Sequence, residues 1–367
     1  MAQVGLLGAS GYTGRLVAQA LDRRRVNLIA AARDAGRVQR AVGHLPAVTE
    51  VRAVDVTDRD GLGDLLSGVD VVVSTAGPFV DLGPPVLDAA IRAGVDYVDS
   101  TGEQPFLRWA FDERATAAAR AGTTAVPACG FDYLPGDLLA DVAGTQVESA
   151  RDVHVAYLVR GSGGWASRGT RRTMVGVLAA PGFAYVDGLE QEEPGQVRRL
   201  AWFPRPIGPH HVVGFPGGEP VLVPRHVPHA REVRSYVAIP GVVADLAPLG
   251  KWLLRWAPAR ALLDRLVAAG PEGPAPDRRR QTRWACVAEV VGADGDVARA
   301  WAHGRDVYGF TAEAIATVVA RLVAGDAHAQ GVVAPAEAFD AADLLDELAV
   351  EARMRWSVRP PPPLGGT

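Results

Sequence analysis

The first fourteen residues, MAQVGLLGASGYTG (Met1–Gly14), decide the fold because an apolar run leads straight into glycines 8, 11 and 14. Gly8 permits a tight turn out of a strand, Gly11 lets the backbone approach a diphosphate without a Cβ, and Gly14 lets the next helix pack close to the sheet. A helix that opens at about Tyr12 points its unpaired N–H groups and positive dipole end at the phosphates. This turn predicts a dinucleotide site formed by Gly8, Ser10, Gly11, Tyr12, Thr13 and Gly14.

The segment Val26–Arg33 reads as a second buried strand, at the distance expected for a βαβ unit that binds dinucleotides. It ends in Arg33, where a site for NAD usually carries an acid that binds the ribose hydroxyls. Arg33 therefore predicts the 2′-phosphate of NADP. In the alternative interpretation, Arg33 is a solvated charge at a strand end and Asp34 binds the ribose.

Further apolar, β-branched segments alternate with helical stretches, the strands at 51–56, 69–78, 95–99 and 123–127 and the helices including 84–93 and 106–121. The pattern predicts an α/β fold with a Rossmann-type, doubly wound parallel sheet. Asp55 could receive the adenine amino group or be an ordinary polar residue at a strand end. The small residues that end the fourth strand leave room for the cofactor, at Thr75, Ala76, Gly77 and Pro78.

Composition sets the broad class. The chain has 367 residues, 48% hydrophobic and 22% charged, with a net charge of −4, which indicates an ordinary globular protein of two domains and gives no reason to expect nucleic-acid binding. Cys129 and Cys286 are too few for a disulfide framework, so a reducing compartment is expected. No export signal and no apolar run of about 20 residues is evident, so we expect a cytoplasmic enzyme.

A single lysine limits the mechanism. Lys251 is the only lysine in the chain, and no tyrosine lies four residues before it. The sequence therefore excludes the short-chain dehydrogenase mechanism, which needs a lysine next to a catalytic tyrosine.

Four motifs carry a family resemblance: Gly8–Gly14, Ala76-Gly77-Pro78-Phe79, Tyr97–Glu103 and Cys129-Gly130-Phe131-Asp132-Tyr133-Leu134-Pro135-Gly136-Asp137. Together they resemble the saccharopine dehydrogenase-like oxidoreductases, and most closely the bacterial branch described as trans-acting enoyl reductases. The resemblance spans roughly residues 1–145 and resumes weakly at 308–312 and 331–339. It implies an NADP-dependent enzyme whose chain leaves the nucleotide-binding domain and later returns to it.

That layout implies four regions. They are an NADP-binding Rossmann domain at 1–145, a middle α+β substrate and dimerisation domain at 146–302, a C-terminal helical segment at 303–357 that packs on the Rossmann domain, and a disordered tail at 358–367. The local pattern is compatible, with strands of a mostly antiparallel sheet expected at 152–160, 183–187, 197–203, 229–239 and 279–291, and helices at 311–324 and 340–353. A homodimer is expected.

The loop after the sixth strand supplies the candidate catalytic residues Tyr133 and Asp132. Hydride transfer to an enoyl thioester leaves an enolate oxygen that needs a hydrogen-bond donor and a carbon that needs a proton. Tyr133 and the backbone N–H groups after Gly130 are candidate donors, because this loop lies at the carboxyl edge where open α/β sheets bind ligands. The alternatives are that Asp132 satisfies turn amides and Tyr133 packs between domains.

The leading hypothesis is an NADPH-dependent reductase that acts on an activated C=C bond of an acyl or polyketide intermediate. Two alternatives stay open: a C=N reductase or saccharopine-type amino-acid dehydrogenase, and a regulatory protein that binds NADP without turnover. The substrate is a small molecule or is bound to an acyl carrier protein. An acidic carrier would meet arginines of the middle region, namely Arg168, Arg171, Arg172, Arg278, Arg279, Arg280 and Arg283, although a solvated charge run is an equal explanation.

Two other features have ordinary explanations beside the functional ones. Residues 241–269 form an amphipathic pattern that could cover an acyl site or contact a membrane peripherally, while packing on the protein's own core or a dimer mate is the commoner role. His210, His211, His226 and His229 lie in a proline-rich region expected to be a surface loop. Their spacing lacks two ligands on one helical face, so no metal site is expected.

Overall fold

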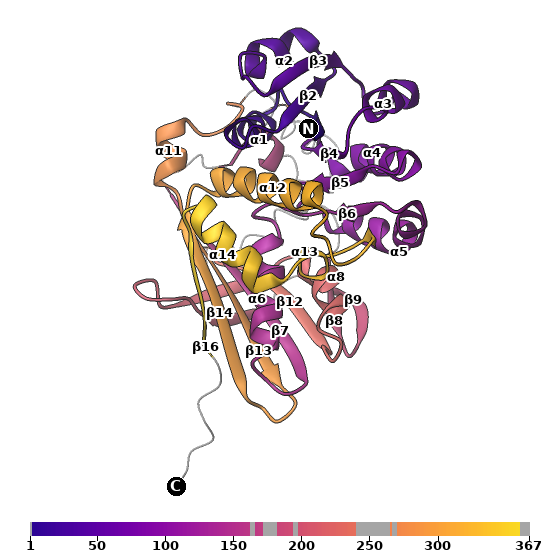
Figure 1. Ribbon diagram of the computed structural model, residues 1–367. Helices are drawn as coiled ribbons and strands as arrows, with labels where there is room; N and C mark the ends of the chain where they lie inside the picture. The colour runs from indigo at the N-terminus through magenta and orange to yellow at the C-terminus, as the bar shows by residue number, and fades with distance from the viewer. Residues whose placement is uncertain are drawn as a thin grey trace. The chain divides into compact units, whose positions relative to one another are not determined.

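The computed structural model describes residues 2–161, 166–171, 182–193, 197–239, 265 and 270–359 (Figure 1). The chain divides into two compact units, unit 1 with residues 1–134 and 307–340, and unit 2 with residues 135–306 and 341–367. The middle of the chain is thus inserted into unit 1. Of the expected C-terminal segment 303–357, residues 307–340 belong to unit 1 and the remainder to unit 2.

Unit 1 is built on a seven-stranded parallel sheet with the strand order β15-β6-β5-β4-β1-β2-β3. From β1 the chain winds outward through β2 and β3, and then restarts on the other side with β4. This is the predicted doubly wound α/β sheet, with a seventh, two-residue strand that the sequence did not indicate. The strands are β1 (Gln3–Leu7), β2 (Asn27–Ala32), β3 (Val48–Ala53), β4 (Val71–Ser74), β5 (Asp96–Asp99), β6 (Thr124–Val126) and β15 (Gly331–Val332).

Helices cover the sheet in two groups. The first group has α1 packed beside α12, and the second has α4 between α3 and α5 (Figure 1). Arg24, the C-cap residue of α1, ties the first group together, because its guanidinium donates to Glu313 at 2.6 Å and to Thr317 at 3.0 Å on α12. The helices are α1 (Tyr12–Arg23), α2 (Ala35–Val42), α3 (Arg59–Leu66), α4 (Phe79–Ala93), α5 (Gln104–Ala121), α12 (Val307–Ala324) and α13 (Pro335–Ala338).

The third strand lies three residues earlier than the prediction of 51–56. It covers Val48–Ala53, so Asp55 follows the strand instead of belonging to it. Val54 and Val56 are nevertheless buried, and their alternation with Asp55 imitates a strand. Asp55 closes a local turn, since its carboxylate accepts bonds from the amide and hydroxyl of Thr57 at 2.9 and 2.8 Å.

Helix α12 is the one helix in the described ranges that is long and apolar enough to cross a membrane by length and composition. Two-thirds of it, 67%, is buried inside the protein. It contacts α1, β4 and β5, all in unit 1. The burial agrees with the role of a core helix, which the sequence pattern at 311–324 predicted with a start four residues later.

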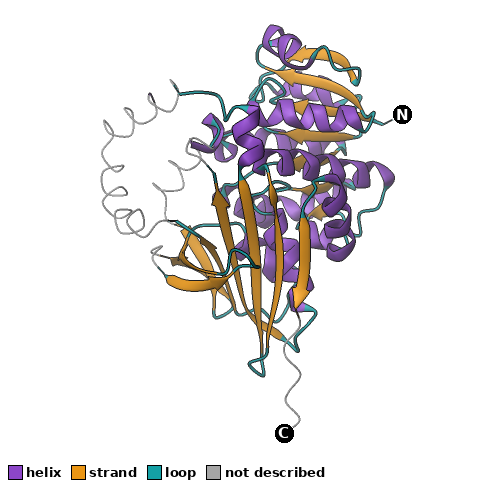
Figure 2. Cartoon of the chain, turned by 90° about the vertical axis from the view of Figure 1, so that its left-hand side faces the viewer, coloured by secondary structure: helices purple, strands orange, loops and turns teal. Residues whose placement is uncertain are grey.

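Unit 2 contains a mixed sheet (Figure 2). It has nine strands, and its main path is β10-β11-β12-β7-β13-β14-β16, with β8 on β12 and β9 on β8. Of the strands that the structure describes here, only β7 and β12 pair in parallel. The strands are β7 (Ala150–Arg160), β8 (Gly182–Val186), β9 (Leu189–Glu193), β10 (Arg198–Trp202), β11 (Pro209–Gly214), β12 (Glu232–Val237), β13 (Arg283–Gly292), β14 (Val297–Arg305) and β16 (Arg355–Arg359).

Several predicted bounds in unit 2 were wrong. Residues 279–281 belong to helix α11 (Pro276–Gln281), where Pro276 starts a helical turn before the strand. His210 and His211 lie in β11 and not in a loop. Strand β16 extends to Arg359, two residues into the range expected to be tail, and the remainder of that tail and nearly all of 241–269 lie outside the described residues. The other helices are α6 (Leu134–Gly144), α8 (Glu219–Leu222), η1 (Val223–Arg225) and α14 (Ala341–Glu351).

His226 is a buried contact of unit 2. Its Nε2 lies 2.7 Å from Asp137 and its Nδ1 lies 3.0 Å from Asp141, both on α6. Burial alone lowers the pKa of His226, but the charge of Asp137 and hydrogen bonds to both carboxylates outweigh burial and raise it to about 10. The imidazolium therefore clamps α6 to the segment that follows η1. Among the described residues, no group of three or more His, Cys, Asp and Glu side chains is arranged to hold a metal.

The clamp predicts a pH dependence of stability. Because the pKa of His226 is higher in the folded state than its usual 6.5, its contribution is complete below about pH 6.5 and is lost as the pH rises toward 10, by at most about 1.4 kcal/mol per pH unit. His226→Gln should flatten this decline in chemical-denaturation experiments between pH 6.5 and 9. The exposed His229 provides the control, His229→Gln. Equal slopes for wild type and His226→Gln would contradict the clamp.

Candidate functional site

The glycine-rich turn joins β1 to α1 at the carboxyl edge of the unit 1 sheet. Gly8 has φ +80°, and a Cβ there would lie 2.7 Å from Thr75 Oγ1. A Cβ on Gly14 would overlap the carbonyl oxygen of Gly8, because α1 passes directly over the turn. Gly11 caps α1, and its Cβ position meets only Gly8 O, at 3.1 Å. The tight turn at Gly8 and the close helix packing at Gly14 agree with the motif, and the predicted approach of a diphosphate to Gly11 stays a prediction.

The turn lies at the topological switch point of the sheet, between β1 and β4. Thr75 fixes the two strand ends, since its amide and its hydroxyl both donate to Leu7 O, at 3.0 and 2.9 Å. Gly8 N donates to Ala31 O of β2 at 2.9 Å. Ligands of open α/β sheets bind in the crevice outside such a switch point. The structure therefore brings the glycine turn and the Thr75–Pro78 segment to one place.

The two helices that follow β1 and β4, the strands of the switch point, differ in how their first turns are capped. The first-turn amides of α4, from Phe79 and Val80, donate to the carboxylate of Glu103 at 3.0 and 2.9 Å. Glu103 is buried, so this cap is an internal one. The first turn of α1 has no acidic residue and no side-chain cap. A pyrophosphate would therefore be received by α1.

The predicted ribose end of the site follows β2. Arg33 is exposed directly after the strand. Asp34 caps α2, because its carboxylate accepts the amide of Arg37 at 2.9 Å. Hydrogen bonds from Thr57 lower the pKa of Asp55, and the charge of Arg33 lowers it further. Arg33 and Asp55 are therefore neighbours, and the helix-capping role of Asp34 favours Arg33 as the group that contacts the ribose phosphate.

Asp99 organises the loops at the ends of β5 and β6. Its buried carboxylate accepts bonds from Tyr97 OH at 2.6 Å, Thr101 N at 2.8 Å and Ala128 N at 2.9 Å. Burial raises its pKa to about 6, although these three bonds oppose the rise. Tyr97 and Asp99 have no exposed surface, so they position the loop and do not reach a substrate.

The two predicted catalytic residues differ in access. Tyr133 is 2% exposed, and its hydroxyl donates to Gly102 O at 2.8 Å. Asp132 is an exposed residue. Its carboxyl group is nevertheless surrounded by protein atoms, and this desolvation raises its pKa to about 6. Asp132 is thus the accessible acid of the pair, and Tyr133 would have to exchange its present partner before it could donate to a substrate.

The backbone donors expected after Gly130 are mostly occupied. Phe131 N donates to Thr311 Oγ1 at 3.1 Å, Tyr133 N to Ala128 O at 3.2 Å and Leu134 N to Gly130 O at 3.1 Å. Thr311 belongs to α12. The sequence predicted this helix but not its contact with the loop after β6. These bonds stabilise the loop and leave fewer amides for an oxyanion than predicted.

Two contacts near the site were not predicted from the sequence. Tyr308 of α12 packs edge-on against Tyr12, with ring centroids 5.0 Å apart, and so supports the first residue of α1. Glu103 caps α4 from 24 positions away along the chain. Both residues lie in motifs that carried the family resemblance, but no local pattern indicates their contacts.

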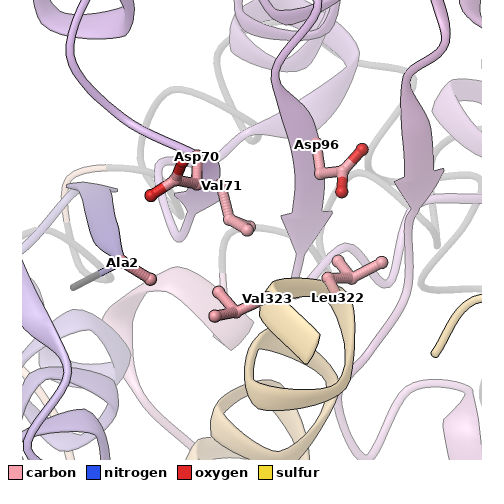
Figure 3. A pocket seen from close by; sticks show the side chains of 6 residues that line it. All are labelled: Ala2, Asp70, Val71, Asp96, Leu322 and Val323. Atoms are coloured by element: carbon pink, nitrogen blue, oxygen red, sulfur yellow. The ribbon is translucent and has the colours of Figure 1, made fainter. Parts of the chain in front are cut away.

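A separate hollow of about 520 Å³ lies at the opposite, amino edge of the unit 1 sheet (Figure 3). Its polar residues have structural roles: the Asp70 carboxylate accepts Gln3 N at 2.8 Å, and Asp96 accepts Thr124 N at 2.7 Å. None of the predicted site residues lines it. Its lining consists of Ala2, Asp70, Val71, Asp96, Leu322 and Val323.

Comparisons with known proteins agree with this geometry. Residues 4–126 match the family model of the saccharopine dehydrogenase NADP binding domain. A Mycobacterium tuberculosis protein that carries the name trans-acting enoyl reductase is 30% identical over 271 residues, 71% of this chain and 61% of the relative. A trans-acting enoyl reductase of Mycobacterium ulcerans is 36% identical over 141 residues, covering 37% of this chain and 34% of the relative.

The fold has a solved counterpart. Apo saccharopine dehydrogenase (L-Glu forming) from Saccharomyces cerevisiae superposes with a TM-score of 0.62 at 17% identity, covering 98% of this chain and 99% of that one. The chain therefore carries an NADP-binding domain of the saccharopine dehydrogenase family, is related to proteins named trans-acting enoyl reductase, and shares the fold of saccharopine dehydrogenase. It spans about three-fifths of the length of the first curated relative that it matches.

The preference for NADPH over NADH tests the predicted role of Arg33. Because a guanidinium and a phosphate form a charge-assisted bond, Arg33→Ala should weaken NADPH binding by about 1.5–3 kcal/mol and leave NADH binding nearly unchanged. Fluorescence titration with both nucleotides measures the difference. Arg108→Ala, an exposed arginine of α5, is the control. Equal losses for NADPH and NADH in Arg33→Ala would refute the assignment.

The glycine turn can be tested without unfolding the protein. A side chain at Gly11 meets only Gly8 O at 3.1 Å, so Gly11→Val should fold, melt close to the wild-type temperature and lose dinucleotide binding. Gly14→Val should instead destabilise the unit, since α1 would be pushed off the turn. Calorimetric melting with and without NADPH separates the cases. A Gly11→Val protein that binds NADPH normally would contradict the placement.

Proposed function

We propose that the chain is an NADPH-dependent reductase that transfers hydride to an activated C=C bond of an acyl or polyketide thioester. The observation that carries the proposal is the NADP-binding turn at the switch point, in a chain whose relatives are named trans-acting enoyl reductases. A free small molecule and a carrier-bound acyl group are both substrates of this class. A cytoplasmic homodimer remains part of the proposal.

The residues fit the cofactor at its diphosphate and at its 2′-phosphate. The missing Cβ at Gly11 keeps the backbone open to the diphosphate, and the uncapped first turn of α1 offers amides to it. Arg33 would hold the 2′-phosphate, with Asp55 beside it. NADPH supplies the hydride when it is bound.

The chain must then supply one proton. Asp132 suits this role better than Tyr133, because solvent reaches it and its raised pKa keeps part of the carboxyl protonated near pH 6. Asp99, which has a similar pKa, is enclosed by three hydrogen bonds and by the core. In this proposal Asp132 donates the proton, and Tyr133 holds the loop through Gly102.

C=N reduction is the second candidate, favoured by the fold match to saccharopine dehydrogenase. It needs the same cofactor and an acid near the accepting nitrogen. A regulatory protein that binds NADP without turnover would keep the glycine turn and Arg33 but need no accessible acid. The accessible Asp132 weighs against that alternative.

The acceptor is tested by NADPH oxidation with purified protein. An enoyl thioester should be reduced, and an imine formed from an amino acid and a 2-oxo acid should not. With Asp132 as the acid, kcat should fall about tenfold per pH unit above pH 6, and Asp132→Asn should remove most of the activity without changing NADPH affinity.

Tyr133→Phe is the matched control for the proton donor. It removes only the hydroxyl that bonds Gly102 O, so it should lower stability more than turnover. The assignment to Asp132 is wrong if Tyr133→Phe abolishes turnover while Asp132→Asn preserves it. Reduction of the imine but not the thioester would favour the second candidate function.

A further inference from the structure

One end of the unit 2 sheet carries an arginine on each of four neighbouring strands. Arg283 at the start of β13 pairs in register with Arg160 at the end of β7 and with Arg305 at the end of β14. Directly opposed residues point to the same face of a sheet, so the three guanidinium groups share one face. On β16, Arg355 lies opposite His303, on the same face and one side-chain repeat from Arg305. We call Arg160, Arg283, Arg305 and Arg355 the arginine row; all four are exposed.

Elsewhere on the same face, arginine side chains are paired with a glutamate. Six residues along β13 from Arg283, the opposed pair is Glu289 and Arg299, and Glu289 also binds Arg199 of β10. There an acid separates two arginines. In the arginine row, arginine opposes arginine, an arrangement that costs stability because like charges face each other.

The nearby acids are already paired with other arginines. Asp306 binds Arg279 at 2.8 Å, and Asp277 binds Arg280. Within the part of the chain that the structure describes, no carboxylate forms an ion pair with a member of the row; Arg160 contacts His210 instead. The charge of Arg355 also helps to lower the pKa of His303, after desolvation. Among the described residues, the row is therefore a positive surface that no carboxylate compensates.

The structure changes the cationic patch expected from the sequence. Arg279 and Arg280 are used in ion pairs, and Arg168 and Arg171 bond the backbone carbonyls of Gly270 and Pro271. Arg172 lies outside the described residues. Of the described arginines in the expected patch, Arg283, itself a member of the row, and the exposed Arg278 of α11 are left without such a bond.

We infer that the arginine row is the docking surface for an acidic protein that carries the acyl substrate, an inference that rests on the proposed reductase function. Strands are spaced about 4.8 Å apart, so four strands spread the charges over roughly 14 Å, wider than one phosphate group. All four side chains of the row are also exposed in the described part of the chain. An extended positive surface of this kind matches a row of carboxylates on a partner and accelerates its association.

The test variant removes three positive charges of the row and introduces no negative ones. A variant with Arg160→Gln, Arg283→Gln and Arg305→Gln should lose at least about tenfold in kcat/KM for a crotonyl group carried on a purified acyl carrier protein, measured at low salt. Reduction of a small crotonyl thioester should be unchanged. A second variant with lysine at the same three positions keeps the charge and should restore much of the lost rate. Exposed arginines of α4 and α5 give the control triple, Arg92→Gln, Arg108→Gln and Arg120→Gln.

Carrier binding is measured separately by fluorescence anisotropy of the labelled carrier protein, so the docking inference and the proposed reaction fail independently. Salt-sensitive binding that the glutamine triple loses supports docking even if no reduction is seen. Equal effects on carrier-bound and small substrates, or unchanged carrier binding, overturn the inference. Equally strong, arginine-dependent binding of free pyrophosphate by calorimetry would also overturn it, since the row would then be a small-anion site.

Discussion

The structure of unit 1 depends on one close approach, that of the α1 backbone to the turn after β1. No side chain fits between them at Gly14, and Gly8 must take a left-handed conformation beside Thr75. Because α1 passes so close, its first turn lies at the switch point between β1 and β4. Of the two helices beside this switch point, α4 is capped by Glu103 and α1 has no side-chain cap, which favours α1 as the helix end that receives a diphosphate.

Buried carboxylates shape both units, but in different ways. In unit 1, buried Asp99 uses its hydrogen bonds to fix the loops near the accessible Asp132, and desolvation by surrounding protein atoms raises the pKa of both carboxyl groups. In unit 2, Asp137 and Asp141 hold His226 as a cation within the fold. The His226 charge in the interior of unit 2 is therefore balanced by carboxylates. Among the described residues, no carboxylate balances the arginine row at the end of the sheet.

The sequence predicted features that local patterns determine. The spacing of glycines and apolar strands predicted the glycine turn, the doubly wound sheet and the NADP-binding domain. These features depend on local backbone conformation and on which residues are buried, and both leave a pattern in the sequence. Strand β3 was misplaced because Val54 and Val56 are buried beyond the strand end. Strands such as β16 escaped prediction because their exposed and half-buried residues give no apolar run. The Glu103 cap and the arginine row depend on pairing between distant segments, which no local pattern contains.

The central claim is that NADPH binds at the glycine turn on the carboxyl edge of the unit 1 sheet. Hydrogen–deuterium exchange with and without NADPH tests it directly, because bound phosphates protect the amides that they contact. The account predicts slower exchange in peptides that cover Gly8–Gly14 and Thr75–Pro78, and no change around Asp70 and Asp96 at the opposite hollow. Protection at that hollow, with unchanged exchange at the glycine turn, would contradict the account.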